Sequence, residues 1–122
     1  MGGKSRRFIR FKKLESYYKK KKLTNFKLIK GDIFFTLEKF LKNYKKKIAL
    51  LHLDLDTYEP TKFALDNMYK FLKKGSIILC DDYNAAVGAT KAINEFLKEK
   101  NCKIKKLKYH KKPYFIEIKN KI

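Results

Sequence analysis

Carboxylates gather in two short windows of a strongly basic chain. HLDLDTYEPT, residues 52–61, contains Asp54 and Asp56, and ILCDDYNAAVGAT, residues 78–90, contains Asp81 and Asp82. Carboxylates that lie close together repel one another unless a cation neutralises them. Oxygen ligands favour Mg²⁺ or another hard cation over zinc. The two windows therefore predict a divalent-cation site if the fold brings them together; otherwise the acids cap helices or pair with lysines.

The segments around these windows alternate between strand and helix patterns. A nearly continuous apolar run leads into each window, as expected of a buried parallel strand. Apolar residues recur at helical spacing between the runs, and Pro60 suits the first turn of a helix. The predicted strands are residues 25–31, 47–56, 75–83, 103–109 and 113–120, and the predicted helices are residues 34–44, 60–72 and 89–97.

This order predicts an α/β fold, with a mostly parallel sheet, helices on both faces and a closing antiparallel hairpin. Ligands of such sheets bind outside the carboxyl ends of the strands, which is where all four aspartates fall. Asp54 and Asp56 are two residues apart and point to the same side of a strand. Aspartates on a neighbouring strand would lie about 5 Å away. The acids thus mark the functional edge of the predicted sheet.

The histidines and cysteines indicate no nucleophilic site. His52 lies inside a predicted strand and is expected to pack in the core, whereas His110 is expected in a turn. Cys80 is expected to be a buried strand residue. Two cysteines without a CxxC pattern fit a reduced, cytoplasmic setting. No apolar run approaches the roughly 20 residues that a membrane span needs.

The charge is lopsided, with a formal net charge of +20 from 29 lysines, 3 arginines and 12 acids. Lys, Asn, Ile, Phe and Tyr are enriched together, which is the bias that an AT-rich genome imposes. The alternative is a binding module for nucleic acid or another anionic surface, non-specific because arginine is scarce. Residues 1–22 carry ten cations against Glu15 alone, so they form a basic arm or a weak helix, and residues 8–22, where aromatic residues interleave with lysines, are the best candidate surface.

The acidic windows resemble the macrocin O-methyltransferase family (TylF/MycF-like), class I methyltransferases that use S-adenosylmethionine. The family pattern runs D-x-D-x-Y-x-x-T, a helix, D-D-Y and a K-A-x-x-x-F helix, and residues 54–61, 81–83 and 91–96 match it in order. KLIKGDIFFTLEKFL also resembles the family's strand that ends in Gly-Asp, here Gly31 and Asp32. The resemblance covers about residues 23–120.

The resemblance implies an O-methyltransferase that acts on a small-molecule hydroxyl, typically of a sugar. It implies a Mg²⁺ held by Asp54, Asp81 and Asp82. It implies that Asp32 faces the adenine of S-adenosylmethionine, and that Asp56, Tyr83 and His52 lie beside the metal ligands.

The family's first βαβ unit, with its glycine-rich cofactor loop, has no counterpart here, because Gly2 and Gly3 follow no predicted strand. We therefore expect residues 1–22 to be a basic arm and residues 23–122 to be the C-terminal portion of a truncated methyltransferase domain. Its fold would be a partial Rossmann-like three-layer sandwich with an incomplete cofactor site. The sheet would then have an exposed edge, which favours a homo-oligomer.

A different enzyme class stays open. DLDTY resembles the D-x-D-x-T motif of haloacid dehalogenase-like phosphatases, in which the first aspartate is a nucleophile and Mg²⁺ sits between carboxylates. In this sequence Thr57 directly follows Asp56, and Tyr58 stands where that motif has its threonine.

Overall fold

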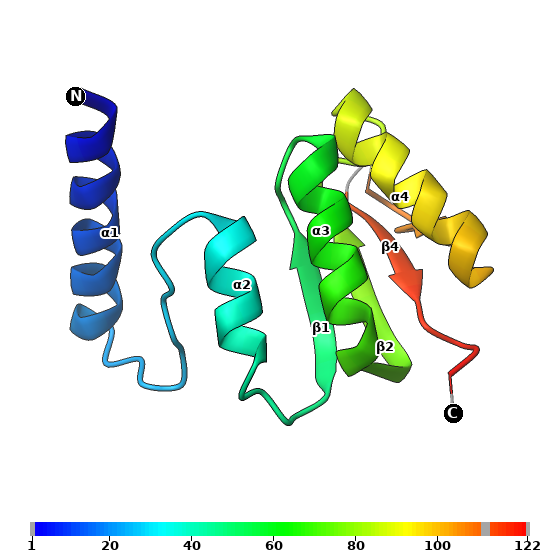
Figure 1. Ribbon diagram of the computed structural model, residues 1–122, viewed down its shortest axis with the longest axis horizontal. Coiled ribbons are helices and arrows are strands. Elements are labelled where there is room, and N and C mark those ends of the chain that lie inside the picture. The colour runs from blue at the N-terminus through cyan, green and yellow to red at the C-terminus, as the bar shows by residue number, and fades with distance from the viewer. Residues whose placement is uncertain (1, 111–112, 122) are drawn as a thin grey trace. The chain divides into compact units, whose positions relative to one another are not determined.

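The computed structural model describes residues 2–110 and 113–121 and divides into two compact units, residues 1–32 and 33–122. The first unit contains helix α1 (Gly2–Lys20), coloured blue in Figure 1. The helix is one of the two states expected of the basic arm. The sequence-based domain boundary at residue 22 stays a prediction.

The predicted strand at residues 25–31 is wrong. This segment has no regular secondary structure, and Leu23, Phe26 and Ile29 are 40–45% exposed. Phe26 of this segment contacts the nearby Tyr18, with ring centroids 4.7 Å apart. A strand must pair with a neighbour to satisfy its backbone groups. The described strands include none that pairs with this segment, so its β-forming residues do not form a strand.

The second unit is built on a four-stranded sheet in the order β1-β2-β4-β3. The strands are β1 (Ile48–Leu53), β2 (Leu72–Cys80), β3 (Ile104–Lys106) and β4 (Tyr114–Glu117). β1 and β2 pair in parallel, while β4 pairs antiparallel to both β2 and β3. The closing hairpin is confirmed, although residues 111 and 112 of its connection lie outside the described residues. The sheet is mixed rather than mostly parallel, because the strand expected at residues 25–31 does not form.

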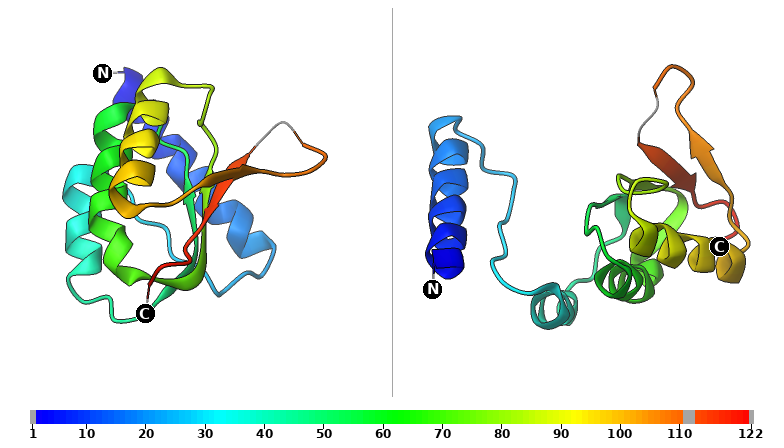
Figure 2. Two further views of the ribbon diagram at one scale, coloured as in Figure 1. Left: turned by 90° about the vertical axis from the view of Figure 1, so that its right-hand side faces the viewer. Right: turned by 90° about the horizontal axis from the view of Figure 1, so that it is seen from above.

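Three helices cover one face of this sheet (Figure 2): α2 (Ile33–Leu41), α3 (Tyr58–Met68) and α4 (Val87–Lys100), with a short 3₁₀ turn, η1 (Tyr69–Phe71), after α3. The core between helices and sheet contains alternate strand residues such as Leu51, Ile78 and Ile116. Within residues 33–122 the unit therefore has two layers. The opposite face of the sheet carries Leu50, which is 57% exposed, and His52.

Helix α4 ends at Lys100 and is capped by Asn101, which has a left-handed backbone conformation (φ 52°), and the amide of Cys102 then donates to the carbonyl of Leu97. None of the helices in the described residues is both long and apolar enough to cross a membrane. A cytoplasmic location stays a prediction.

Lys121, near the C-terminus, binds the backbone around the 3₁₀ turn η1. Lys121 Nζ donates to the carbonyl oxygens of Tyr69 (2.6 Å) and Leu72 (2.9 Å), and it lies 4.0 Å from the centroid of the Tyr69 ring. Tyr69 caps the C-terminus of α3 and Leu72 caps that of η1, so both carbonyls lie at helix C-termini, where a cation is favoured by the orientation of the backbone dipoles.

Replacing Lys121 with methionine should therefore lower the free energy of unfolding by about 1–3 kcal/mol, because both carbonyls lose a charged donor. Urea denaturation measures the change. Lys119→Met, at an exposed position two residues earlier, is the control and should stay within about 0.5 kcal/mol of the parent chain. Equal effects of the two substitutions would contradict a fastening role for Lys121.

Candidate metal centre

The parallel pairing of β1 with β2 brings the two acidic windows together. Leu53 pairs with Cys80 at the last position of both strands, so the residues that follow them emerge at the same edge of the sheet. Carboxylate oxygens of Asp54, Asp56 and Asp82 all lie within 4.8 Å of one another. Asp81 is next to them, and its amide donates to the carbonyl of Leu53 (3.1 Å). All four aspartates thus gather at the carboxyl edge.

Backbone geometry helps to hold the acids in this arrangement. The amide of Asp56 donates to Asp82 Oδ2 at 2.9 Å and ties the first acidic loop to the second. Asp56 has a left-handed backbone conformation with φ 62°, which is uncommon for residues other than glycine. Such conformations are concentrated at functional sites. This hydrogen bond keeps Asp56 next to Asp82 in the cluster.

The carboxylates raise one another's proton affinity. The pKa of Asp54 lies above its ordinary value, chiefly because the charge of Asp81 is close and secondarily because of partial desolvation. The pKa of Asp56 is also raised, first by its hydrogen bond with Asp82 and then by that residue's charge. A cation bound between these groups would relieve the repulsion.

His52 is not the packed core residue that we expected from the sequence. Its side chain is 52% exposed, because alternation along β1 turns it to the face opposite α2, α3 and α4. Nε2 of His52 lies 3.8 Å from Asp81 Oδ1. His52 therefore borders the acidic cluster from the open face.

Hydrogen bonds of Tyr83 and Asn84 hold the loop that follows β2, the second acidic loop, which begins with Asp81 and Asp82. The hydroxyl of Tyr83 donates to Asn94 Oδ1 at 2.7 Å. Asn84, with φ 65°, donates through its amide to Thr90 Oγ1 (2.9 Å) and through Nδ2 to the hydroxyl of Tyr114 (3.2 Å). Sequence reasoning missed Asn84, Thr90 and Tyr114, because no local pattern links residues that far apart in the chain.

Two contacts that the sequence did not predict hold the start of helix α3 against α4, and we call them the brace: the hydrogen bond from Tyr58 to Glu95 and the close packing of Gly88. The Tyr58 hydroxyl donates to the Glu95 carboxylate, with oxygen–oxygen distances of 2.7 and 2.9 Å. Gly88 packs so closely that a Cβ atom there would lie 2.7 Å from the backbone nitrogen of Tyr58. Because α3 begins two residues after Asp56, the brace fixes the position of the chain directly after Asp56.

Tyr58 should ionise at a higher pH than an unperturbed tyrosine does. Its hydrogen bond with Glu95 raises the pKa of Tyr58 to about 12, with desolvation and the Glu95 charge as further causes. A raised folded-state pKa means that the bond stabilises the fold fully below pH 10 and is lost as pH rises toward 12. Absorbance titration near 295 nm should show a late phenol step that is missing in Tyr58→Phe. If that variant keeps every step, the assignment is wrong.

Asp32 and Cys80 are the remaining residues that the sequence singled out. Asp32 is the last residue of the first unit, and its role at an adenine stays a prediction. Cys80 is buried as expected, and burial raises the pKa of its thiol to about 12, so this thiol is unreactive at neutral pH.

The donor set at the carboxyl edge fits a hard divalent cation. The groups that lie within 4.8 Å of one another are carboxylates, Asp54 and Asp56 are exposed, and Asp82 is half-buried. Such oxygen ligands suit Mg²⁺ or Mn²⁺ and not a softer metal. Which of the four aspartates would bind the ion directly stays a prediction.

Comparison with known proteins gives a family and a set of similar structures. Residues 13–109 match the family of macrocin O-methyltransferase (TylF). Two solved structures of CalS11 are similar to the chain with a TM-score of 0.68 and 31% sequence identity. One is described as a calicheamicin methyltransferase and the other as a TDP-rhamnose 3′-O-methyltransferase of calicheamicin biosynthesis. The similarity covers 74% of this chain but 36% and 41% of those chains. No curated protein gives a significant match.

Proposed function

The chain belongs to the macrocin O-methyltransferase family, and we propose that it serves S-adenosylmethionine-dependent methyl transfer to a hydroxyl of a small molecule, with a divalent cation at its acidic edge. The observation that carries this proposal is the carboxylate cluster of Asp54, Asp56 and Asp82, whose oxygens lie within 4.8 Å. The cluster falls inside the segment that matches the family.

The chain's own residues would bind and orient the reacting group. Asp54 and Asp82 are common to the observed cluster and to the ligand set that the family resemblance implies. The third ligand would be Asp81 by that resemblance or Asp56 by proximity. Mg²⁺ held there would lower the pKa of an acceptor hydroxyl. His52 on the open face would border the acceptor.

The two candidates for the third ligand can be separated by substitution. Asp56→Asn keeps the backbone amide that donates to Asp82, and Asp81→Asn removes the charge beside His52. The resemblance predicts that Asp81→Asn weakens cation binding more than Asp56→Asn. The reverse order would assign the position to Asp56.

The acceptor and the cofactor site are proposed from the family. CalS11 acts on a TDP-sugar, and a sugar hydroxyl is the acceptor that we propose for this chain. S-adenosylmethionine would supply the methyl group. The chain spans 36–41% of the length of the solved relatives, so we propose that residues 33–122 correspond to the part of a three-layer sandwich that carries the cation site. Asp32 is the residue that we propose near the adenine, and self-association through the free edge of β1 is proposed as well.

Calorimetric titration with S-adenosylhomocysteine, first with Mg²⁺ and then with EDTA, tests this function. Saturable cofactor binding near micromolar concentration would support a methyltransferase site. Cation binding that is lost in Asp81→Asn, without cofactor binding, would limit the function to the acceptor side. Absence of both would contradict the proposal.

Two other functions remain to be compared with this one. The family match favours a methyltransferase over the phosphatase hypothesis. Magnesium-dependent hydrolysis of a generic phosphate ester that is lost in Asp54→Asn would reverse that preference. A purely anion-binding function would leave Asp54→Asn without effect on binding.

A further inference from the structure

Lysines crowd the amino end of the sheet, opposite the acidic edge. Four segments meet there: residues 42–47 before β1, 70–74 around the start of β2, 100–103 after α4, and 119–121 after β4. Together they contain eleven lysines and no acid. We call these four segments the basic end. The pairing of Ile48 with Leu72 and the bond from Lys121 Nζ to Leu72 place them at one end of the unit.

The segments of the basic end approach one another around Tyr69. Lys100 Nζ and Lys121 Nζ lie 4.4 and 4.0 Å from the centroid of the Tyr69 ring. Lys47 Nζ donates to the carbonyl of Lys70 (3.4 Å). The pKa of Lys121 is lowered, first by partial burial and then by the charges of Lys47 and Lys100. Like charges thus come close enough to repel, which a bound polyanion would relieve.

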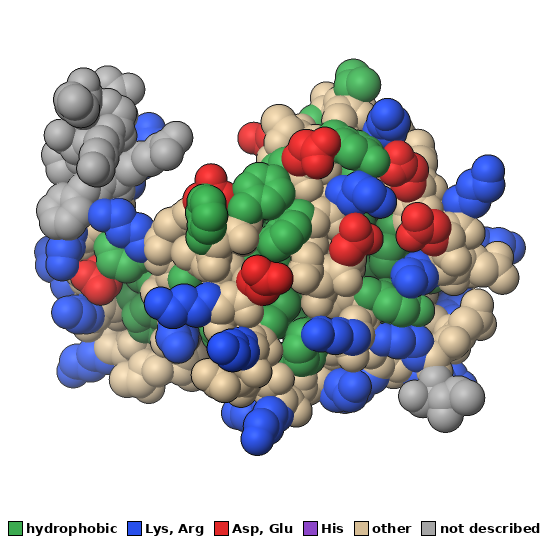
Figure 3. All heavy atoms as spheres, viewed as in Figure 1, with side chains coloured by type: hydrophobic (Ala, Val, Ile, Leu, Met, Phe, Trp, Pro, Cys, Tyr) green, Lys and Arg blue, Asp and Glu red, His purple; other side chains and the backbone are tan. Residues whose placement is uncertain are grey.

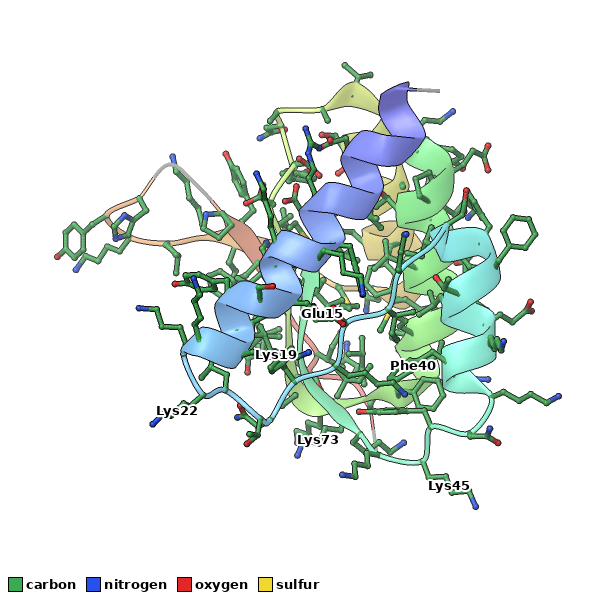
Figure 4. All side chains as sticks on the ribbon, turned by 90° about the vertical axis from the view of Figure 1, so that its left-hand side faces the viewer. Glu15, Lys19, Lys22, Phe40, Lys45 and Lys73 are labelled. Atoms are coloured by element: carbon green, nitrogen blue, oxygen red, sulfur yellow. The ribbon has the colours of Figure 1, made fainter. Side chains whose placement is uncertain are left out.

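Lysines are concentrated in this part of the unit, because the four segments hold 11 of the 20 lysines of residues 33–122. On the face shown in Figure 3, Lys and Arg side chains line the lower edge and also occur at the right and upper right, while acidic side chains lie above the lower edge. Lys45 and Lys73 project from that lower end (Figure 4). A compositional preference for lysine would account for the number of lysines but not for their concentration at one end. Such a one-sided field attracts polyanions.

We propose that the basic end binds the phosphate backbone of duplex nucleic acid without reading its sequence. Lysine supplies point charges for phosphates, and the arginines that read bases lie outside the basic end, at positions 6, 7 and 10. Tyr44 and Phe71 are half-buried and contact each other with ring centroids 5.4 Å apart, so they offer no free platform for unpaired bases. No described side chain in the basic end is among the exposed large apolar residues that would insert into a membrane.

The test compares two triple variants of the full chain in which the same amount of charge is removed. Lys45, Lys46 and Lys73 are exposed members of the basic end, and all three are replaced by glutamine. Lys91, Lys98 and Lys106 are exposed outside the basic end on the same unit and receive the same replacement as the control. Thermal unfolding first verifies that both variants fold. Fluorescence anisotropy with a mixed-sequence DNA duplex then measures affinity across a salt series.

We expect the slope of log affinity against log salt to become shallower by about 0.9 for each lysine–phosphate ion pair removed, hence by about 2.7 in the basic-end variant, and to change little in the control. Equal changes in the two variants would overturn the proposal, because attraction would then depend on net charge alone. Tighter binding to single-stranded DNA, or to phosphatidylserine vesicles, than to the duplex would also overturn it.

Discussion

Gly88→Ala should destabilise the protein by about 1–3 kcal/mol, the range for a side chain forced into a packed region. The added Cβ atom would lie 2.7 Å from the backbone nitrogen of Tyr58 and 3.3 Å from the Tyr58 Cβ atom. A backbone atom cannot rotate away as a flexible side chain can, so α4 or the start of α3 must shift. That shift would move the loop of Asp56.

Urea denaturation measures this effect, and Val87→Ala is the matched control. Val87 precedes Gly88 in the same helical turn and is 89% exposed, so its truncation should change stability by less than about 0.5 kcal/mol. If the Gly88→Ala variant has the same free energy of unfolding as the parent chain, α3 and α4 can move apart with little loss of stability. The brace would then have no role in placing the acids.

Asp54→Asn should have opposite effects on the metal-free and the cation-bound protein. Without a cation, removing one of four crowded charges relieves the repulsion that raises the pKa of Asp54, so the thermal midpoint should rise. With Mg²⁺ or Mn²⁺, losing a carboxylate ligand should weaken affinity at least about 10-fold. Thermal unfolding with and without the cation measures both effects.

Asp66→Asn is the control for that pair of effects. Asp66 lies on α3, outside the cluster, and its partner is Lys62 at 3.8 Å. Its replacement should leave the cation-dependent shift of the midpoint unchanged. Equal loss of the shift in both variants would mean that net charge, rather than the cluster, attracts the cation.

The effect of Asp54→Asn on the metal-free protein should depend on pH in a defined direction. Because the folded-state pKa of Asp54 is raised, the folded protein binds more protons than the unfolded chain between the ordinary value of 3.8 and the raised value. Stability in that window rises as pH falls. The advantage of the asparagine variant should therefore be largest near neutral pH and shrink toward pH 4.

The carboxyl edge was predictable from sequence because its signals are local. Apolar runs that end in acids define β1 and β2, and the general rule for parallel strands then brings Asp54 and Asp82 to one edge. Helices α2, α3 and α4 followed from apolar spacing, and the closing hairpin followed from its two short β-rich runs. In each of these elements, local preference and tertiary packing agree.

The failures of prediction have non-local causes. Residues 25–31 have strand-forming composition but no pairing partner among the described strands, and a strand exists only as part of a sheet. His52 was expected in the core because apolar residues flank it, yet its exposure depends on which sheet face the helices cover. The brace joins Tyr58 to Glu95 across 37 residues, a separation that no short pattern encodes.

Manganese titration followed by electron paramagnetic resonance tests the central claim, a cation site at the carboxyl edge, most directly. The signal of free Mn²⁺ reports how much ion each chain removes from solution. We expect one saturable Mn²⁺ per chain, displaced by Mg²⁺ and lost in Asp82→Asn, which keeps a side-chain oxygen for the Asp56 amide. No saturable binding, or equal binding by parent and Asp82→Asn, would contradict a metal centre formed by these aspartates.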